Sequence, residues 1–137
     1  SDLLENVLGS PDVIVTNLPY IPSSRIPYLD PSVRDFEPRL ALDGGPDGFE
    51  LYRKLFDQIM RKFLPDSLKY QGVNSTHIQG VLGRHIGISS SLKLIVCEID
   101  YTHGELAIQE AQKFFPKARI EVKTDLAKKQ RILMINW

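Results

Sequence analysis

The distribution of apolar and polar residues along the chain predicts four short strands. Residues 12–16 and 92–97 are runs of apolar, partly β-branched side chains, and each run is too short for a helix and predicts a buried strand. Near the end of the sequence, residues 119–123 and 131–136 alternate between the two kinds of side chain. They predict a terminal pair of strands.

Two further segments show the period of an amphipathic helix. From residue 47 to Phe63, apolar side chains recur at spacings of three and four, and a second helix is predicted from residue 102 to about Phe115. Capping-box spacing occurs in two pairs, Asp47 with Glu50 and Thr102 with Glu105. The order of strands and helices predicts one α/β domain over residues 1–137, with a mostly parallel sheet covered by helices and an antiparallel terminal strand pair.

Residues 18–46 show neither period. Six prolines and the pair Gly44-Gly45 predict a long, stiff loop without regular elements, and loops of such length inside a compact domain are usually functional. Residues 65–91, which are rich in Ser, Gly and His, are also predicted to be loop.

The composition is that of one globular domain, with 42% hydrophobic residues, 25% charged residues and a formal net charge of zero. Residues 1–50 nevertheless carry a net charge of −6, whereas residues 113–137 carry +5. This asymmetry indicates either two solvated faces or a basic docking face for an acidic partner. The sequence has one cysteine, Cys97, no signal-peptide pattern and no apolar run of the ~18–20 residues that cross a membrane, so we expect a cytoplasmic location.

Candidate chemistry follows the first predicted strand, in the tetrapeptide Asn17-Leu18-Pro19-Tyr20. Open α/β sheets bind ligands beyond the carboxyl ends of their strands. The Asn17 amide can donate and accept hydrogen bonds, Pro19 holds Leu18 in an extended conformation that leaves its carbonyl able to accept one, and Tyr20 offers a flat face. Such groups can orient a planar nitrogen toward an electrophile ~3–3.5 Å away, as methyl transfer from a sulfonium requires. The alternative is that the tetrapeptide merely ends a strand and begins a turn.

A longer pattern accompanies this tetrapeptide, in the segments Ile21-Pro22, Val33–Pro38, Ala41–Gly45, Cys97–Glu105 and Thr124–Ala127. In these segments the chain resembles the protein-glutamine methyltransferases that modify peptide-chain release factors. These are class I enzymes that use S-adenosyl-L-methionine. The resemblance covers nearly the whole chain apart from residues 65–91.

This resemblance implies a Rossmann-like fold and a specific reaction. The intact protein would transfer a methyl group from S-adenosyl-L-methionine to the side-chain amide nitrogen of a glutamine, in a Gly-Gly-Gln segment of a release factor. The substrate site would be Asn17, Leu18, Pro19 and Tyr20, with Asn17 and Tyr20 as the catalytic residues and the Leu18 carbonyl accepting one amide hydrogen. Asp2 and Leu3 would flank the adenine of the cofactor, with Asn17 close by.

The chain also departs from the family pattern. Leu18 and Asp100 replace a proline and a glycine, and residues 65–91 replace a short turn. The sequence contains no G-x-G, whereas the family's cofactor loop is glycine-rich. We therefore expect the chain to be the C-terminal half of the catalytic domain, without the N-terminal helical domain, and to be inactive alone. A half-sheet exposes an open edge and apolar surface, which predicts self-association.

Two other functions stay open. Methylation of an exocyclic amine on adenine or cytosine would use Asn17 and Tyr20 on an extruded base, although the neutral charge and the release-factor-type pattern weigh against nucleic acid. A non-catalytic interaction module would bind no cofactor. No metal site is predicted, because His77, His85 and His103 share no ligand spacing with each other or with Cys97.

Overall fold

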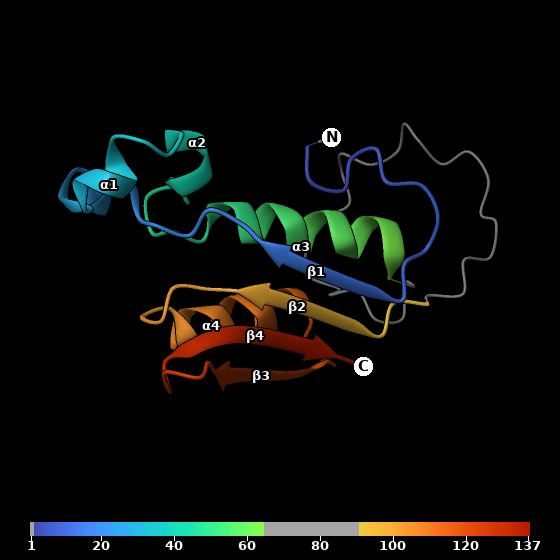
Figure 1. Cartoon of the computed structure of the whole chain (residues 1–137). Coiled ribbons are helices and arrows are strands. Elements are labelled where there is room, and N and C mark those ends of the chain that lie inside the picture. The colour runs from blue at the N-terminus through green and yellow to red at the C-terminus, as the bar shows by residue number, and fades with distance from the viewer. Residues whose placement is uncertain (1, 65–90) are drawn as a thin grey trace.

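The computed structural model describes residues 2–64 and 91–137, so the loop predicted at 65–91 lies almost wholly outside the described residues. Along the chain the main elements follow in the order strand, helix, strand, helix, strand, strand, as the sequence predicts (Figure 1). The main elements are β1 (Val13–Asn17), α3 (Glu50–Phe63), β2 (Leu94–Glu98), α4 (Gly104–Phe114), β3 (Arg119–Thr124) and β4 (Gln130–Asn136).

The four strands form one sheet in the order β1-β2-β4-β3. β1 pairs with β2 in parallel, whereas β2 with β4 and β3 with β4 are antiparallel pairs. The prediction of a mostly parallel sheet is therefore wrong for the described strands, and the sheet is mixed. A tight turn is the reason: the backbone N–H of Asp125 bonds the Lys129 carbonyl at 2.8 Å, so β4 returns beside β3 and its other edge pairs with β2. The predicted antiparallel terminal pair is confirmed.

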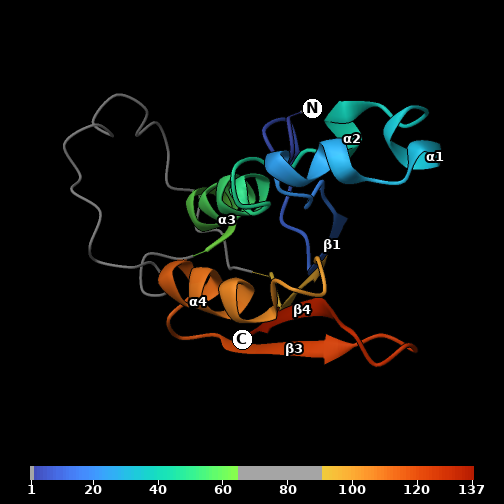
Figure 2. The same ribbon diagram turned by 90° about the vertical axis from the view of Figure 1, so that its left-hand side faces the viewer.

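Both long helices pack on the same face of the sheet (Figure 2). The strand residues that point to this face are buried with the apolar faces of the helices, namely Ile14, Ile95, Cys97, Leu133 and Ile135. Phe56 of α3 lies at the centre, with its ring edge-on to Phe115 at a centroid distance of 5.2 Å. Burial of such aromatic and aliphatic side chains supplies the main stabilisation of the fold.

The other face of β1 is not covered by the described helices. Val15 is 73% exposed, so the prediction of a fully buried first strand is wrong. Val15 is exposed because β1 lies at the edge of the described sheet and packs only its Ile14 side against the helices. Exposed valines on an edge strand are the kind of surface on which the expected self-association rests.

Neither predicted capping box forms. α3 begins at Glu50, because Gly48 has a φ of +77° and interrupts the helical path after Asp47. Asp47 instead accepts a hydrogen bond from the backbone N–H of Phe49 at 3.0 Å. At α4, the Thr102 N–H and hydroxyl both bond the Asp100 carboxylate, so Thr102 is not available to cap the helix. Short side chains of this kind often bond the nearest turn in place of the helix end.

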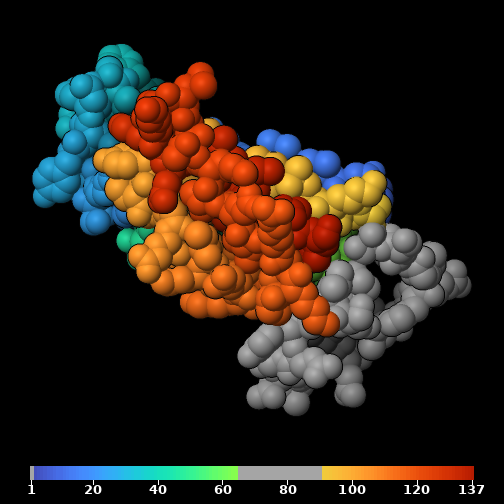
Figure 3. All heavy atoms as spheres, turned by 90° about the horizontal axis from the view of Figure 1, so that it is seen from below, coloured from blue at the N-terminus to red at the C-terminus, as the bar shows by residue number. Residues whose placement is uncertain are grey.

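The segment 18–46 contains short helices, although a loop without regular elements is predicted there. These are η1 (Ser23–Tyr28), α1 (Pro31–Arg34) and α2 (Arg39–Leu42). Prolines suit such pieces because a first helical turn needs no donor from the proline nitrogen. The segment closes on itself, since the Ile21 and Ser23 N–H groups bond the Leu42 and Gly45 carbonyls at 3.1 and 2.9 Å. It projects at the end of the molecule where the β3–β4 turn also lies (Figures 1 and 3). Within the described ranges, no helix is long and apolar enough to cross a membrane.

An ionic network fastens the end of this segment to both long helices. Arg53 of α3 pairs with Asp47 at 2.5 Å and with Glu110 of α4 at 2.9 Å. The hydrogen bonds from Arg53 lower the pKa of Asp47 from 3.8 to about 2. The network therefore ties the segment's last turn to the helical layer.

This network predicts a pH-dependent stability. Because the Asp47 pKa is lower in the folded chain, its contribution is complete above the ordinary pKa near 4 and is lost as the pH falls toward 2. Asp47→Asn should lower the free energy of unfolding at pH 6 by up to about 1 kcal/mol, since the group is partly exposed, and the difference should vanish near pH 2. Denaturant unfolding measures it, with Asp57→Asn of the exposed Asp57–Arg61 pair as control. A difference independent of pH would contradict the assignment.

Candidate active site

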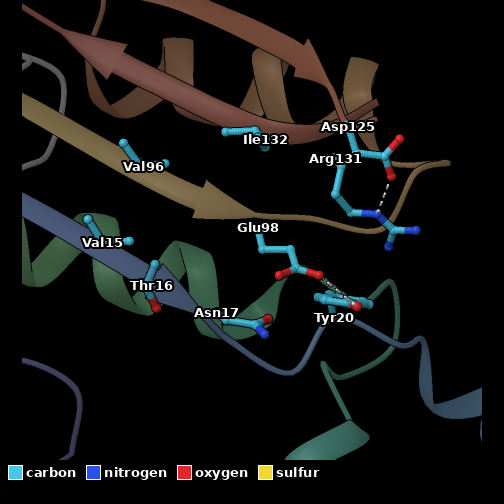
Figure 4. A pocket seen from close by; sticks show the side chains of 9 residues that line it. All are labelled: Val15, Thr16, Asn17, Tyr20, Val96, Glu98, Asp125, Arg131 and Ile132. Carbon is cyan, nitrogen blue, oxygen red and sulfur yellow. Dashed lines mark hydrogen bonds and ion pairs between the residues drawn. The ribbon is translucent and has the colours of Figure 1, made fainter. Parts of the chain in front are cut away.

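A pocket of about 640 Å³ lies where β1 and β2 end, on the face of the sheet that the described helices leave open. Asn17, Tyr20, Glu98, Arg131 and Asp125 line it with their polar groups, as Figure 4 shows. Its apolar floor is formed by Val15, Val96 and Ile132. A pocket with a few convergent polar groups over an apolar floor suits a small planar substituent.

Asn17 is the last residue of β1 and pairs in register with Glu98, the last residue of β2. The two side chains consequently emerge on the same face, from neighbouring parallel strands. Asn17 is exposed, and its amide points into the pocket (Figure 4). One amide and one carboxylate thus stand side by side, which gives the site two kinds of acceptor and a neutral donor.

Tyr20 closes the pocket beyond Asn17. Its hydroxyl donates to the Glu98 carboxylate, with 3.3 Å between Oη and Oε1. Burial raises the pKa of Tyr20, and the neighbouring Glu98 charge raises it further, so the phenol stays protonated and remains a donor. This bond fixes the ring orientation, so the ring lies at the mouth of the pocket as a flat surface.

A cation completes the rim. Arg131 at the start of β4 lies 3.7 Å from the Asp125 carboxylate and packs its guanidinium 5.8 Å from the centroid of the Tyr101 ring. Sequence reasoning assigned no role to Glu98 or Arg131. Glu98 could have been found by the signal that marked Asn17, because it is the polar residue that ends a predicted buried strand.

Two glycines allow the chain to pack tightly behind the tetrapeptide. A Cβ at Gly44 would lie 2.7 Å from the Pro19 carbonyl oxygen and 2.8 Å from the Tyr20 Cα. At Gly48, whose φ is +77°, a Cβ would lie 2.3 Å from the Tyr20 carbonyl oxygen. Gly44 and Gly48 therefore let residues 44–48 pack directly against Pro19 and Tyr20, an approach that a Cβ at either position would block.

The tetrapeptide residues have different surroundings. Leu18 packs against the hydrophobic core, and its carbonyl accepts a hydrogen bond from the Tyr52 hydroxyl at 3.2 Å. The carbonyl predicted to serve a substrate is thus already bonded once, and one lone pair is left for a second donor. Neither Leu18 nor Pro19 lines the pocket, so of the tetrapeptide only Asn17 and Tyr20 do.

The predicted cofactor residues lie apart from this pocket. The Asp2 carboxylate pairs with Lys54 of α3, and Leu3 packs on the core. Neither lines the pocket that Asn17 and Tyr20 share. Their assignment to the cofactor stays a prediction.

Other candidate groups have structural surroundings. Cys97 is fully buried in β2, and burial raises the pKa of its thiol to about 12, so it is inert as a nucleophile. Among residues 2–64 and 91–137, no group of three or more His, Cys, Asp or Glu side chains could hold a metal. His103 precedes α4, and burial lowers its pKa. His77 and His85 lie outside the described residues.

Fold and site together define an α/β protein whose strand ends present an amide, a phenol and a carboxylate to one pocket. No family model matches the chain. Curated proteins named release factor glutamine methyltransferase do match it, and they are homologues of the chain over part of its length. The resemblance found in the sequence is thereby confirmed.

Three of these relatives show how far the similarity extends. The protein from Caulobacter vibrioides is 54% identical over 57 residues, which cover 42% of this chain and 20% of the relative. The Bradyrhizobium diazoefficiens protein is 51% identical over 57 residues, or 42% of this chain and 19% of the relative. The Bacillus cereus protein is 30% identical over 122 residues, or 89% of this chain and 34% of the relative. The matches therefore span about a fifth to a third of these relatives.

The backing behind Tyr20 predicts the effect of adding one methyl group. Gly44→Ala should lower the free energy of unfolding by about 1–3 kcal/mol, because all three atoms nearest to the new Cβ belong to the backbone and cannot rotate away. Denaturant unfolding measures this loss. Leu40→Ala, at an 87% exposed position of the same segment, is the control and should change it by less than about 0.5 kcal/mol. Equal stability of wild type and Gly44→Ala would show that the backing is loose.

Proposed function

We propose that the chain forms the acceptor side of a methyltransferase that modifies the side-chain amide of a glutamine in a release factor. The observation that carries this proposal is the pairing of Asn17 with Glu98 at the ends of two parallel strands, with Tyr20 beside them, in a chain homologous to release factor glutamine methyltransferases. Residues 1–137 are then part of a larger catalytic domain. A Gly-Gly-Gln segment is the expected peptide.

The chemistry asks little of the protein beyond orientation. An amide nitrogen is a weak nucleophile because its lone pair is delocalised, so its hydrogens must be held while the lone pair is aimed at the methyl group. One of these hydrogens leaves as a proton to solvent when the carbon–nitrogen bond forms and the carbon–sulfur bond of the donor breaks. The Asn17 side-chain oxygen and the Leu18 carbonyl supply two acceptors, and the Asn17 NH2 donates to the glutamine carbonyl. Tyr20 limits the tilt of the amide plane. Fixed orientation of this kind is worth several orders of magnitude in rate.

The donor in this proposal is S-adenosyl-L-methionine, which supplies a methyl group on a sulfonium. The assignment of Asp2 and Leu3 to this cofactor stays a prediction, and in the structure Asp2 pairs with Lys54 at an exposed position while Leu3 packs against the core. The sequence also lacks the glycine pattern that lets a backbone approach a nucleotide closely. The cofactor therefore has to be held mainly by other parts of the polypeptide.

Asn17→Ala in the complete native protein that carries this sequence should lower kcat/KM for the release factor by roughly 100-fold or more, because a positioned hydrogen bond at the reacting group is lost. Transfer of labelled methyl to release factor, RNA and DNA measures it. Asn136→Ala is the matched control, since Asn136 lies at the far end of the sheet, in register with Leu94. Wild-type activity of Asn17→Ala would refute its role, and transfer to nucleic acid alone would refute the substrate.

The 137-residue chain alone should bind S-adenosyl-L-methionine at least about a thousandfold more weakly than the complete protein, because two or three hydrogen bonds worth ~1.5–3 kcal/mol each are missing. Calorimetric titration of both proteins measures the difference. A micromolar dissociation constant for the chain alone would mean that the cofactor site is present within it.

A further inference from the structure

We propose that Tyr52 is a positioning residue for the acceptor site, because its hydroxyl ties together the main chains that carry Asn17 and Glu98. This inference rests on the proposed function and concerns the same pocket. Tyr52 lies in α3, on the apolar helix face that the sequence pattern assigns to the core. Its hydroxyl nevertheless reaches the ends of two strands.

The contacts of this hydroxyl are specific. It lies 3.2 Å from the carbonyl oxygen of Leu18, the residue after β1, and within hydrogen-bond distance of the carbonyl oxygen of Glu98, the last residue of β2. Tyr52 is completely buried, so water cannot replace either contact. One proton is thus shared between two acceptors on neighbouring strands.

The Tyr52 hydroxyl bonds the two chains at the point where the backbone pairing of β1 with β2 ends. The register of β1 with β2 ends at the Asn17–Glu98 pair. Pro19 has no backbone N–H and cannot extend the ladder. A side-chain donor is therefore the means by which the ends of the two strands are held together, and Tyr52 supplies it from the helical layer.

The aromatic ring makes the hydroxyl position rigid. It stacks on Phe49 with 4.6 Å between centroids and an interplanar angle of 17°. Burial raises the pKa of Tyr52 well above its ordinary value, so the group is a donor at every physiological pH. Gly44 and Gly48 back the tetrapeptide from the other side.

The consequence concerns the two groups that would touch a substrate. The Leu18 carbonyl keeps one lone pair for an amide hydrogen, and the bond from Tyr52 fixes the direction of that lone pair. The two contacts of the Tyr52 hydroxyl, with the Leu18 and Glu98 carbonyls, also set the spacing between the Asn17 amide and the Glu98 carboxylate, because both main chains are bonded to one atom. A core tyrosine without this role could be a phenylalanine at no cost to the reaction.

Tyr52→Phe in the complete native protein keeps the ring and removes only the hydroxyl. We expect kcat for methyl transfer to the release factor to fall by about 10- to 100-fold, as displacements of ~1 Å from the reacting geometry do, while KM for S-adenosyl-L-methionine stays within about twofold because the cofactor is held elsewhere. Tyr28→Phe is the matched control, since Tyr28 is 87% exposed and does not line the pocket. It should leave kcat unchanged.

A second measurement needs no activity. The carbon-13 resonance of the Leu18 carbonyl should move upfield in Tyr52→Phe and not in Tyr28→Phe, because a carbonyl that loses a donor is less deshielded. An unchanged resonance, an unchanged kcat, or a fall in kcat no larger than the loss of folded protein would each overturn the inference. If wild type transfers no methyl group to the release factor, it is the proposed function that fails, and the resonance still decides whether the tie exists.

Discussion

The site depends on the parallel pairing of β1 with β2 and on where that pairing stops. Five residues of each strand lie in register, and the last pair is Asn17 with Glu98. Pro19 ends the ladder, so the chain turns away within two residues of the paired strand end. An amide and a carboxylate are thereby left side by side at the point where the pairing of β1 with β2 ends.

The long segment after β1 contributes Tyr20 to the rim of the pocket, and the other lining residues belong to the strands and to the turn between β3 and β4. The ends of this segment are joined by backbone hydrogen bonds between Ile21, Ser23 and the stretch from Leu42 to Gly45, and the Ser23 hydroxyl bonds Asp43 at 2.5 Å. Arg25 reaches back to Asp100 after β2 at 3.1 Å. The residue that replaces a glycine of the family pattern thus anchors the segment. Ordering this many residues costs conformational entropy, which the prolines reduce in advance.

The sequence predicts the elements well and their connections less well. The spacing of apolar residues alone places α3 and α4 within a few residues, and the alternation of apolar and polar residues places β3 and β4. Both patterns arise because one side of each element is buried in the core. The order of strands in the sheet cannot be read from local sequence. It depends on contacts between distant segments, which place β4 between β2 and β3. The capping boxes failed for a local reason, since Gly48 delays the start of α3 and the Asp100 carboxylate bonds the Thr102 hydroxyl.

A similar division holds for the site. Asn17 and Tyr20 could be predicted because each stands in a short motif after a strand, and the structure brings both into one pocket. Glu98 carries the same signal as Asn17, because it is the polar residue at the end of a buried strand, whereas Arg131 could not be placed there before the neighbours of β2 were known. Tyr52 is the hardest case, since its spacing on the helix is that of a core residue and its hydroxyl partners are backbone carbonyls, which leave no pattern in the sequence.

The most direct test of the acceptor site is to observe the Asn17 side chain when a substrate binds. In the complete native protein, labelled at asparagine and saturated with the demethylated cofactor, a peptide containing Gly-Gly-Gln should shift the nitrogen-15 resonance of the Asn17 amide, and a Gly-Gly-Asn peptide of the same length should not. Resonances at the Asn17 amide that stay unchanged with the glutamine peptide, or that move with adenine- or cytosine-containing oligonucleotides, would contradict a site built for glutamine.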